Sequence, residues 1–384
     1  MIAKLQNQAR DYAWGSKTLI ADYFGIPATG YPMAEIWFGT HEGSPTKLAD
    51  NHTVSLREHI GGELSFLLKI LAAEQPLSIQ AHPNLDQAKA GFERENAAGV
   101  PLSASHRNYK DANHKPEMIV ALTEFEALCG FRNEPQIRNL LLDMVEAPDV
   151  SATFVAISQS WLDAFNAGGT AALVASILEP KFEGQPIELG GFNAELSQLA
   201  DFSARFELAA TLNRLFPGDP GVVVALLMNH VRLEPGQALY LPAGNIHAYI
   251  AGLGVELMAN SDNVLRGGLT SKHIDVPELL SVLNFEPSPV PFVQPVELAH
   301  GLVEYPAAAA DFRLYRASVS GSNLLAEIAL PSAAIVLCAG GEVDLSNSRG
   351  EHELLRRGEA AYISADARHF TLSGSGDVFI AMGN

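Results

Sequence analysis

Five residues in three short motifs could bind a divalent metal ion or act beside one. Gln80 and His82 stand two residues apart in an apolar run that predicts a strand, so their side chains point to the same face. Lys115 and Glu117 share a face by the same rule, at the entrance of the next apolar run. A glycine-containing turn then delivers His247 to the start of another strand. Two imidazoles, a carboxylate and an amide oxygen suit a catalytic divalent metal that keeps one position open.

None of these motifs is specific by itself. A lone histidine in a strand is more often packed or hydrogen-bonded than bound to a metal. The pair Pro116 and Glu117 would also suit a solvated strand end. Whether the side chains converge therefore depends on the elements that position them.

Strands are expected on both sides of a helical block. Short apolar runs broken by Pro, Gly and Asn fill residues 66–122, and the same pattern returns after Gly221. Strands are predicted at 77–81, 118–122, 222–227, 231–233 and 238–241. Short strands with frequent turns are typical of a jelly roll. The tail from residue 291 has the same texture, so a second, C-terminal jelly roll is expected.

Residues 133–218 have the spacing of helices. Asn133 precedes Pro135 as a helix cap, and apolar residues follow at intervals of three and four. Further helices are predicted at 170–178 and at 194–216, where helix-forming residues dominate. This block is interpreted as a helical insert between two β-rich segments.

A short internal similarity favours two related β units. Residues 236–241 match residues 358–363 in register, and the same shift places His369 at the position of His247. The similarity predicts two units that each form a double-stranded β-helix, with the chemistry in only one of them. His369 is expected to lie outside any metal site, because several donors must converge to bind a metal.

Composition excludes several classes of protein. Of the 384 residues, 47% are apolar, which is enough for at least one full core. Asp and Glu number 44 against 25 Lys and Arg, so nucleic acid and membranes are not expected as partners, whereas a small anionic substrate needs only a few cations. Cys129 and Cys338 are too few for a disulfide framework. The sequence has no signal segment and no apolar run long enough to cross a bilayer, so the chain is expected to be cytoplasmic. The sequence leaves the oligomeric state open, and a monomer is compatible with it.

The motifs resemble those of type I phosphomannose isomerases. The resemblance is carried by Gln80-Ala81-His82-Pro83 and by the segments 109–117 and 241–247, in that order. It extends to the segments 12–15, 34–41, 256–268 and 269–273. The resemblance covers most of residues 1–285, whereas the helical insert and the tail match in architecture only. Asn245 and Ile246, before His247, depart from the pair that many relatives carry.

The resemblance implies a zinc-dependent aldose-ketose isomerase of the cupin type, which interconverts mannose 6-phosphate and fructose 6-phosphate. It implies one zinc ion per chain, bound by Gln80, His82, Glu117 and His247. It also implies a substrate pocket lined by Lys115, Glu256 and Arg266, with Ser78 and Lys272 as further pocket residues.

An isomerase of this kind needs a base and an electrophile, because the carbonyl moves between C1 and C2 through an enediolate. Zinc is the natural electrophile. His114, Glu256 and Asp262 are the candidate bases, although each could instead support the metal or form an ordinary salt bridge. Arg266 and Lys272 lie on a Gly-rich stretch, which is expected to offer charge, hydroxyls and open backbone N–H groups to a phosphate or to the enediolate.

The predicted organisation is a mainly β fold with a helical insert. The cupin-type catalytic unit is expected to comprise residues 1–132 and 219–290, the insert residues 133–218, and the C-terminal jelly roll residues 291–384.

Two other functions remain open. His82, His247 and Glu117 also form the two-histidine, one-carboxylate set of non-haem Fe(II) oxygenases, although Gln80 as a fourth donor leaves fewer positions for O₂ and substrate. The other alternative is a sugar-binding cupin without catalysis. Lys115 and the other charged pocket residues weigh against it, because binding alone would not need them.

Overall fold

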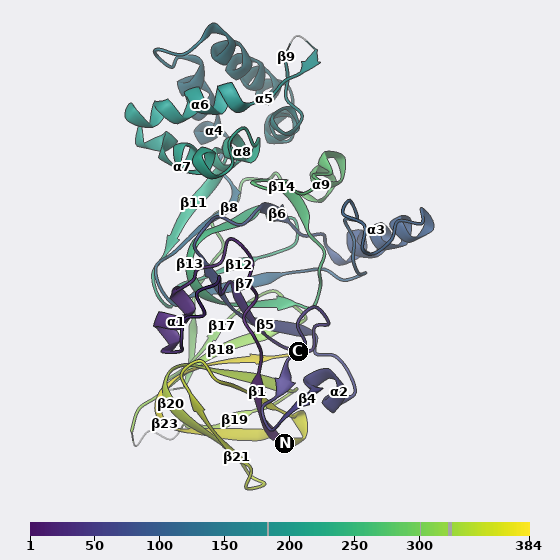
Figure 1. The fold of residues 1–384 in the computed structure, drawn as a ribbon, viewed down its shortest axis with the longest axis vertical. Coiled ribbons are helices and arrows are strands. Elements are labelled where there is room, and N and C mark those ends of the chain that lie inside the picture. Colours follow the sequence, from purple (N-terminus) through teal and green to yellow (C-terminus); the bar gives the residue numbers. More distant parts are fainter. Residues whose placement is uncertain (183, 300, 322–324) are drawn as a thin grey trace.

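The computed structural model describes residues 1–182, 184–299, 301–321 and 325–384. Three parts follow one another along its long axis: a group of helices, a ten-stranded sheet and an eleven-stranded sheet (Figure 1). Every strand pair described below is antiparallel. The mainly β fold with a helical insert is therefore confirmed.

Strand β13 (His247–Ala259) organises the ten-stranded sheet, because four strands pair along its length. These strands are β5 (Phe66–Ala73), β6 (Ile79–Ala81), β7 (Glu117–Ala121) and β8 (Phe125–Phe131). The outer strands are β2 (Glu35–Phe38) beside β5, β14 (Leu265–Gly268) beside β6, β12 (Ala238–Leu241) beside β7, β11 (Met228–Leu233) beside β8 and β15 (Phe292–Val293) beside β12.

An irregularity in β13 decides which of its side chains share a face. The register against β8 shifts between Tyr249 and Ala251, so one extra residue is accommodated there. A bulge of this kind moves the alternation of side chains by one position. His247 and Tyr249, before the bulge, therefore share a face with Glu256 after it, although strict alternation would place Glu256 on the opposite face.

The eleven-stranded sheet contains strands from both ends of the chain. Its path runs β16 (Val296–Ala299), β17 (Leu302–Tyr305), β18 (Arg313–Val319), β23 (His369–Met382), β20 (Ala334–Asn347), β22 (Ala360–Ile363), β1 (Ile2–Gln6), β3 (Lys47–Leu48) and β4 (Asn51–Ser55), with β19 (Leu325–Ala329) beside β23 and β21 (His352–Arg356) beside β20. Ile2 pairs with Ile363. Assigning all of residues 1–132 to the catalytic unit is thus wrong for β1, β3 and β4, which belong to the eleven-stranded sheet. The sequence gives no local signal of this pairing, because the partner strands are more than 300 residues apart.

The two sheets repeat one pairing pattern. Strands β11, β12 and β13 pair with the consecutive strands β7 and β8, whereas β21, β22 and β23 pair with the single long strand β20. Strands β12 and β22 begin 122 residues apart, and so do β13 and β23. The two related β units expected from the internal similarity are therefore confirmed.

The helical insert connects β8 to β11, whereas residues 348–351 alone connect β20 to β21. Its helices are α4 (Glu134–Val145), α5 (Ala152–Leu178), α6 (Gly190–Gln198), α7 (Glu207–Leu215) and α8 (Gly221–Leu226). Asn133 caps α4, as predicted, by accepting a hydrogen bond from the backbone N–H of Gln136.

Two predictions for this region are wrong. The single helix expected at 194–216 is divided into α6, two short 3₁₀ turns (Leu199–Asp201 and Ala204–Phe206) and α7. The strand expected at 222–227 is helix α8, and all six residues of α8 are buried. A short run that is buried on every side has no apolar period, so periodicity cannot separate a helix from a strand.

Helix α5 is also longer and more apolar than expected. It has 27 residues and an 18-residue window of mean hydropathy 1.2, enough by length and composition to cross a bilayer. Phe154, Trp161 and Leu173 nevertheless pack into the core of the insert. The helix is broken at Gly168 and Gly169, where Gly169 has φ +65°. We therefore interpret α5 as a core helix.

In the described part of the chain, four further α-helices lie outside the insert: α1 (Leu19–Phe24), α2 (Leu56–Ile60), α3 (Leu85–Ala97) and α9 (Val276–Val282). Helix α3 follows β6 and begins at Asn84, whose side chain accepts a hydrogen bond from the backbone N–H of Gln87. An ion pair between Arg94 and Glu278 joins α3 to α9. These contacts hold the segment directly after His82.

Candidate metal centre and active site

Three of the predicted ligands form one buried cluster. The distance from His82 Nε2 to Glu117 Oε1 is 3.3 Å, and that from His247 Nε2 to Glu117 Oε2 is 3.2 Å. Each of the three residues is only 1% exposed. One donor atom from each lies within 4.8 Å of the others, which is close enough to converge on one metal ion.

Backbone carbonyls orient the two imidazoles. His82 Nδ1 donates a hydrogen bond to the Asn263 carbonyl at 2.7 Å, and His247 Nδ1 donates to the Asn245 carbonyl at 3.0 Å. Both Nε2 lone pairs therefore face the cluster, as metal-binding histidines require. Burial lowers the pKa of His82 to about 4, so its imidazole is neutral at pH 7 and free to act as a ligand.

The cluster contains polar atoms that the protein does not satisfy. Among the described residues, His82 Nε2 and Glu117 Oε2 are buried without a hydrogen-bond partner. Such atoms are costly unless a cation or another partner meets them. Burial raises the pKa of the Glu117 carboxyl, but Lys115 and His82 lower that pKa by more than burial raises it. The pKa of Glu117 therefore lies well below its usual range. The donor set therefore fits a divalent metal ion.

Gln80 and Lys115 complete the surroundings of the cluster. Gln80 lies between His247 on β13 and Arg266 on β14, and its carboxamide is 3.3 Å from His247 Nε2. Lys115 Nζ is 3.0 Å from Glu117 Oε1. The three motifs identified in the sequence thus converge at one place.

A cavity of about 530 Å³ opens beside this cluster. Seven of the predicted site residues line it: Ser78, Gln80, Lys115, Glu117, Glu256, Arg266 and Lys272. His82 and His247 lie behind Glu117. Aromatic side chains of Tyr12, Trp14, Phe216 and Tyr249 form much of the remaining wall. The cavity has both the volume and the mixed lining expected of a site for a small polar molecule.

Sequence analysis missed the buried ion pair in the wall of this cavity. Lys69 Nζ is 2.9 Å from Glu256 Oε2 and 3.7 Å from Glu35 Oε1. Trp37 Nε1 donates to Glu35 at 2.8 Å. Burial opposes the charge of Lys69, but Glu256 and Glu35 raise its pKa above the usual range. A lysine inside the otherwise apolar β5 was the signal that could have revealed it, because lysine is almost never fully buried unless it is paired.

Two predicted site residues point elsewhere. His114 Nε2 lies 2.7 Å from Asp311 Oδ2, on the connection between β17 and β18 of the C-terminal unit. Asp262 Oδ1 lies 3.2 Å from His41 Nε2, and more than half of its side chain is exposed. Neither lines the cavity. Their contacts match the ordinary salt bridges that were the alternative explanation for both.

The loop that carries Lys272 differs from its prediction in one respect. Its backbone N–H groups were expected to be open, but those of Leu269 and Thr270 donate to the Asp219 carboxylate. The N–H of Lys272 donates to the Thr270 hydroxyl. Burial lowers the pKa of the Arg266 guanidinium, and burial together with Arg266 lowers that of Lys272. This end of the cavity therefore offers cationic side chains more than free amides.

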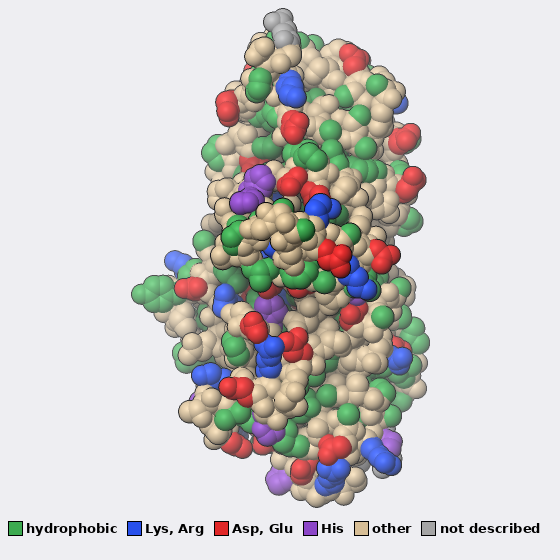
Figure 2. Space-filling view, turned by 90° about the vertical axis from the view of Figure 1, so that its right-hand side faces the viewer, with side chains coloured by type: hydrophobic (Ala, Val, Ile, Leu, Met, Phe, Trp, Pro, Cys, Tyr) green, Lys and Arg blue, Asp and Glu red, His purple; other side chains and the backbone are tan. Residues whose placement is uncertain are grey.

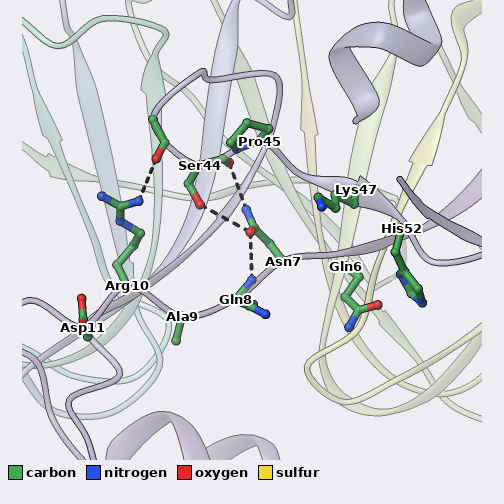
Figure 3. A pocket seen from close by; sticks show the side chains of 11 residues that line it. Gln6, Asn7, Gln8, Ala9, Arg10, Asp11, Ser44, Pro45, Lys47 and His52 are labelled. Atoms are coloured by element: carbon green, nitrogen blue, oxygen red, sulfur yellow. Dashed lines mark hydrogen bonds between the residues drawn. The ribbon is translucent and has the colours of Figure 1, made fainter. Parts of the chain in front are cut away.

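A second cavity of about 570 Å³ lies elsewhere, between the N-terminal segment and the loop before β3 (Figure 3). Arg10 donates to the Gly43 carbonyl there, while Lys47 and His52 lie toward the other side. No predicted site residue lines this cavity. Chemistry rather than volume therefore identifies the candidate site.

A duplicated jelly roll with one buried two-histidine, one-glutamate cluster beside a polar cavity defines a metal-dependent enzyme of the cupin class. Residues 2–134 match the model of the family described as phosphomannose isomerase type I, catalytic domain. The chain is 38% identical to a mannose-6-phosphate isomerase of Salmonella typhimurium, over 97% of each chain, and 33% identical to that of Homo sapiens, over 93% of this chain and 92% of the human one. This chain belongs to the type I phosphomannose isomerase family.

Solved structures agree with this assignment. A zinc-bound mannose 6-phosphate isomerase superposes with a TM-score of 0.88 at 37% identity, covering 100% of this chain and 99% of the other. The Salmonella typhimurium enzyme bound to fructose 6-phosphate and zinc gives the same values. The two alternatives, an Fe(II) oxygenase and a non-catalytic sugar-binding cupin, find no support in these relatives.

Proposed function

We propose that this chain is a zinc-dependent isomerase that interconverts mannose 6-phosphate and fructose 6-phosphate. The observation that carries the proposal is the buried cluster of His82, Glu117 and His247 at one side of a cavity that also holds two cations, Arg266 and Lys272. The first group suits an electrophilic centre and the second suits a phosphate.

Gln80, His82, Glu117 and His247 would hold one zinc ion per chain. The two orphaned polar atoms of the cluster and the neutral state of His82 support this ligand set. When bound, zinc supplies an electrophile that stabilises negative charge on the substrate oxygens. Lys115, ion-paired with Glu117, adds a proton donor at the same side of the cavity.

Glu256 is the one of the three candidate bases that lines the cavity. Burial raises the pKa of its carboxyl, and Glu117 and Glu35 raise it further, while Lys69 lowers it. A base whose pKa lies nearer to neutral pH transfers protons between C1 and C2 more effectively than an ordinary carboxylate. Lys69 orients this carboxylate through the 2.9 Å ion pair.

Arg266 and Lys272 would bind the phosphate of the sugar, with the Ser78 hydroxyl as a further polar contact. Arginine suits recognition by several donors, and lysine suits a point charge. The substrate is thus expected to lie with its phosphate toward the 269–272 loop and its carbonyl end toward Glu117.

The remaining expectations concern partners and location. On the face drawn in Figure 2, Lys and Arg side chains are scattered among Asp and Glu, which does not favour nucleic acid as a partner. Both cysteines are free and buried, which suits a reducing compartment such as the cytoplasm. A sugar phosphate is the expected ligand, and a monomer is compatible with the complete site in one chain.

The test is a coupled assay of the purified protein, together with metal analysis. We expect turnover of mannose 6-phosphate with one zinc per chain, its loss on chelation, and its recovery when zinc is added back. Iron in place of zinc, with O₂ uptake and no isomerisation, would support the oxygenase instead. Binding of the sugar phosphate without turnover would support the non-catalytic cupin.

A further inference from the structure

The Asp219 carboxylate joins the helical insert to the loop that carries Lys272. One oxygen, Oδ1, accepts hydrogen bonds from the N–H groups of Gly221 at 2.7 Å and Leu269 at 2.9 Å. The other oxygen, Oδ2, accepts from the N–H of Thr270 at 3.0 Å. Two of these three donors belong to the substrate loop, fifty residues away in the sequence.

The loop needs such a restraint because its backbone is in a conformation that most residues avoid. Leu269 has φ +53°, which costs an L-residue energy, and its side chain is only 2% exposed. Gly268, with φ +131°, passes so close to Gly221 that a Cβ on it would meet Gly221 Cα at 2.3 Å. The backbone of the loop at Gly268 therefore packs directly against the turn of the insert at Gly221. The Asp219 side chain accepts hydrogen bonds across this contact.

Asp219 is itself held from within the insert. Asn193, which is fully buried in α6, donates from Nδ2 to the Asp219 carbonyl at 3.0 Å. The N–H of Val222 donates to the same carbonyl at 3.1 Å. Phe216, at the start of this turn, lines the cavity beside Lys272. The insert thus reaches the cavity at one point, through the turn 216–221.

We propose that Asp219 is a positioning residue, which sets the phosphate-binding end of the cavity by holding residues 269–270 so that Arg266 and Lys272 face the substrate. This inference rests on the proposed function. Asp219 does not touch the substrate. Its negative charge is taken up by three N–H donors, so it shapes the loop without presenting an anion to the phosphate. The insert then acts as part of the active site.

The experiment compares Asp219→Ala and Asp219→Asn with the parent enzyme. Alanine removes both acceptor oxygens and with them all three hydrogen bonds, and we expect KM for mannose 6-phosphate to rise about tenfold while kcat and zinc content stay near the parent values. Asparagine keeps one oxygen acceptor, so its KM should lie between those of alanine and the parent. The control is Asp201→Ala, which removes an exposed carboxylate from the same insert and should leave KM unchanged.

Two further measurements separate positioning from general damage. In a Lys272→Ala background, Asp219→Ala should raise KM less, because one of the two cations that it positions is already gone. Hydrogen exchange of the amides at 269 and 270 should become faster in Asp219→Ala than in the parent. An unchanged exchange rate, or a fall in kcat with KM constant, would overturn the inference. A parent protein without isomerase activity would instead count against the proposed function, while the exchange measurement would still test the restraint.

Discussion

The two β units share one strand pattern, but among the described residues only the first unit contains a cluster of side chains that could hold a metal ion. His247 begins β13 and pairs with Gln80, whereas His369 begins β23 and pairs with Ala329. The histidine at the start of the strand is thus common to both units. His247 is 1% exposed and faces the cluster, whereas His369 is exposed to solvent.

The other two ligand positions differ in the same way. Two residues after Gln80 comes His82, and two residues after Ala329 comes Pro331. Glu117 lies opposite Met258, and at the corresponding pair of the second unit Val336 lies opposite Ile380. Val336 is fully buried in an apolar core. A jelly roll can therefore form with an apolar core where the other unit has metal ligands, and its catalytic capacity depends on a few side chains rather than on the fold.

The largest expected effect comes from removing the metal ligands that distinguish the first unit from the second. Glu117→Gln and His247→Ala should each lose zinc and lower kcat by about 10³-fold or more, because the electrophile contributes several kcal/mol to the transition state. Metal analysis and the coupled assay measure both losses.

Glu126→Gln is the matched control for these variants, since Glu126 also pairs with a histidine, His230, outside the cluster. It should keep both zinc and activity. If Glu117→Gln or His247→Ala retained full zinc occupancy, that ligand would be wrongly assigned.

A smaller effect is expected at the phosphate end of the cavity. Lys272→Ala should raise KM for mannose 6-phosphate about tenfold with little change in kcat, because phosphate is bound alike in the ground state and the transition state. Steady-state kinetics measure the split. Lys181→Ala, at an exposed lysine of the insert, is the control. A loss confined to kcat would contradict phosphate binding by Lys272.

In the second unit, the expected effect is on stability alone. Val336→Ala should lower the free energy of unfolding by about 2 kcal/mol, because it leaves a cavity in a tightly packed core. Urea denaturation of the zinc-loaded protein measures this change, and zinc content and KM should stay at the parent values. A loss of zinc would show that the two units are coupled more closely than their strand pairing indicates.

The smallest effect is expected at His369. His369→Ala should change the free energy of unfolding by less than about 0.5 kcal/mol and leave zinc content and kcat unaltered, because the side chain is exposed. Metal analysis of the variant and the parent is the decisive comparison. A second zinc ion in the parent that disappears in His369→Ala would refute the assignment of one metal per chain.

The metal motifs could be predicted from the sequence because their geometry is local. Gln80 and His82 stand two residues apart at the end of β6, and Lys115 and Glu117 stand two residues apart at the start of β7, so extended backbone over three consecutive residues is enough to place each pair on one face. Lys69 lies in the same sheet, but its role in the site is not predicted, because the residues around it in β5 are apolar and indicate only a buried core strand.

Long-range contacts explain most of the errors. His114 is a candidate base by residue type, but it pairs with Asp311, which is 197 residues away in the sequence. Glu256 reaches the cavity only because of the bulge in β13, which the sequence does not reveal. The sequence predicts a strand where helix α8 lies, because burial on every side removes the periodic signal.

The pairing of β1 with β22 has a consequence for biosynthesis. Residues 2–5 leave the ribosome long before their partners, residues 360–363, are made. At about 5–20 residues per second, β1 waits roughly 20–70 s for β22. During this time both β1 and the growing sheet expose unpaired backbone edges, which are prone to wrong pairing. The yield of correctly assembled chains in the cell should therefore depend on what shields strand β1 until β22 is made.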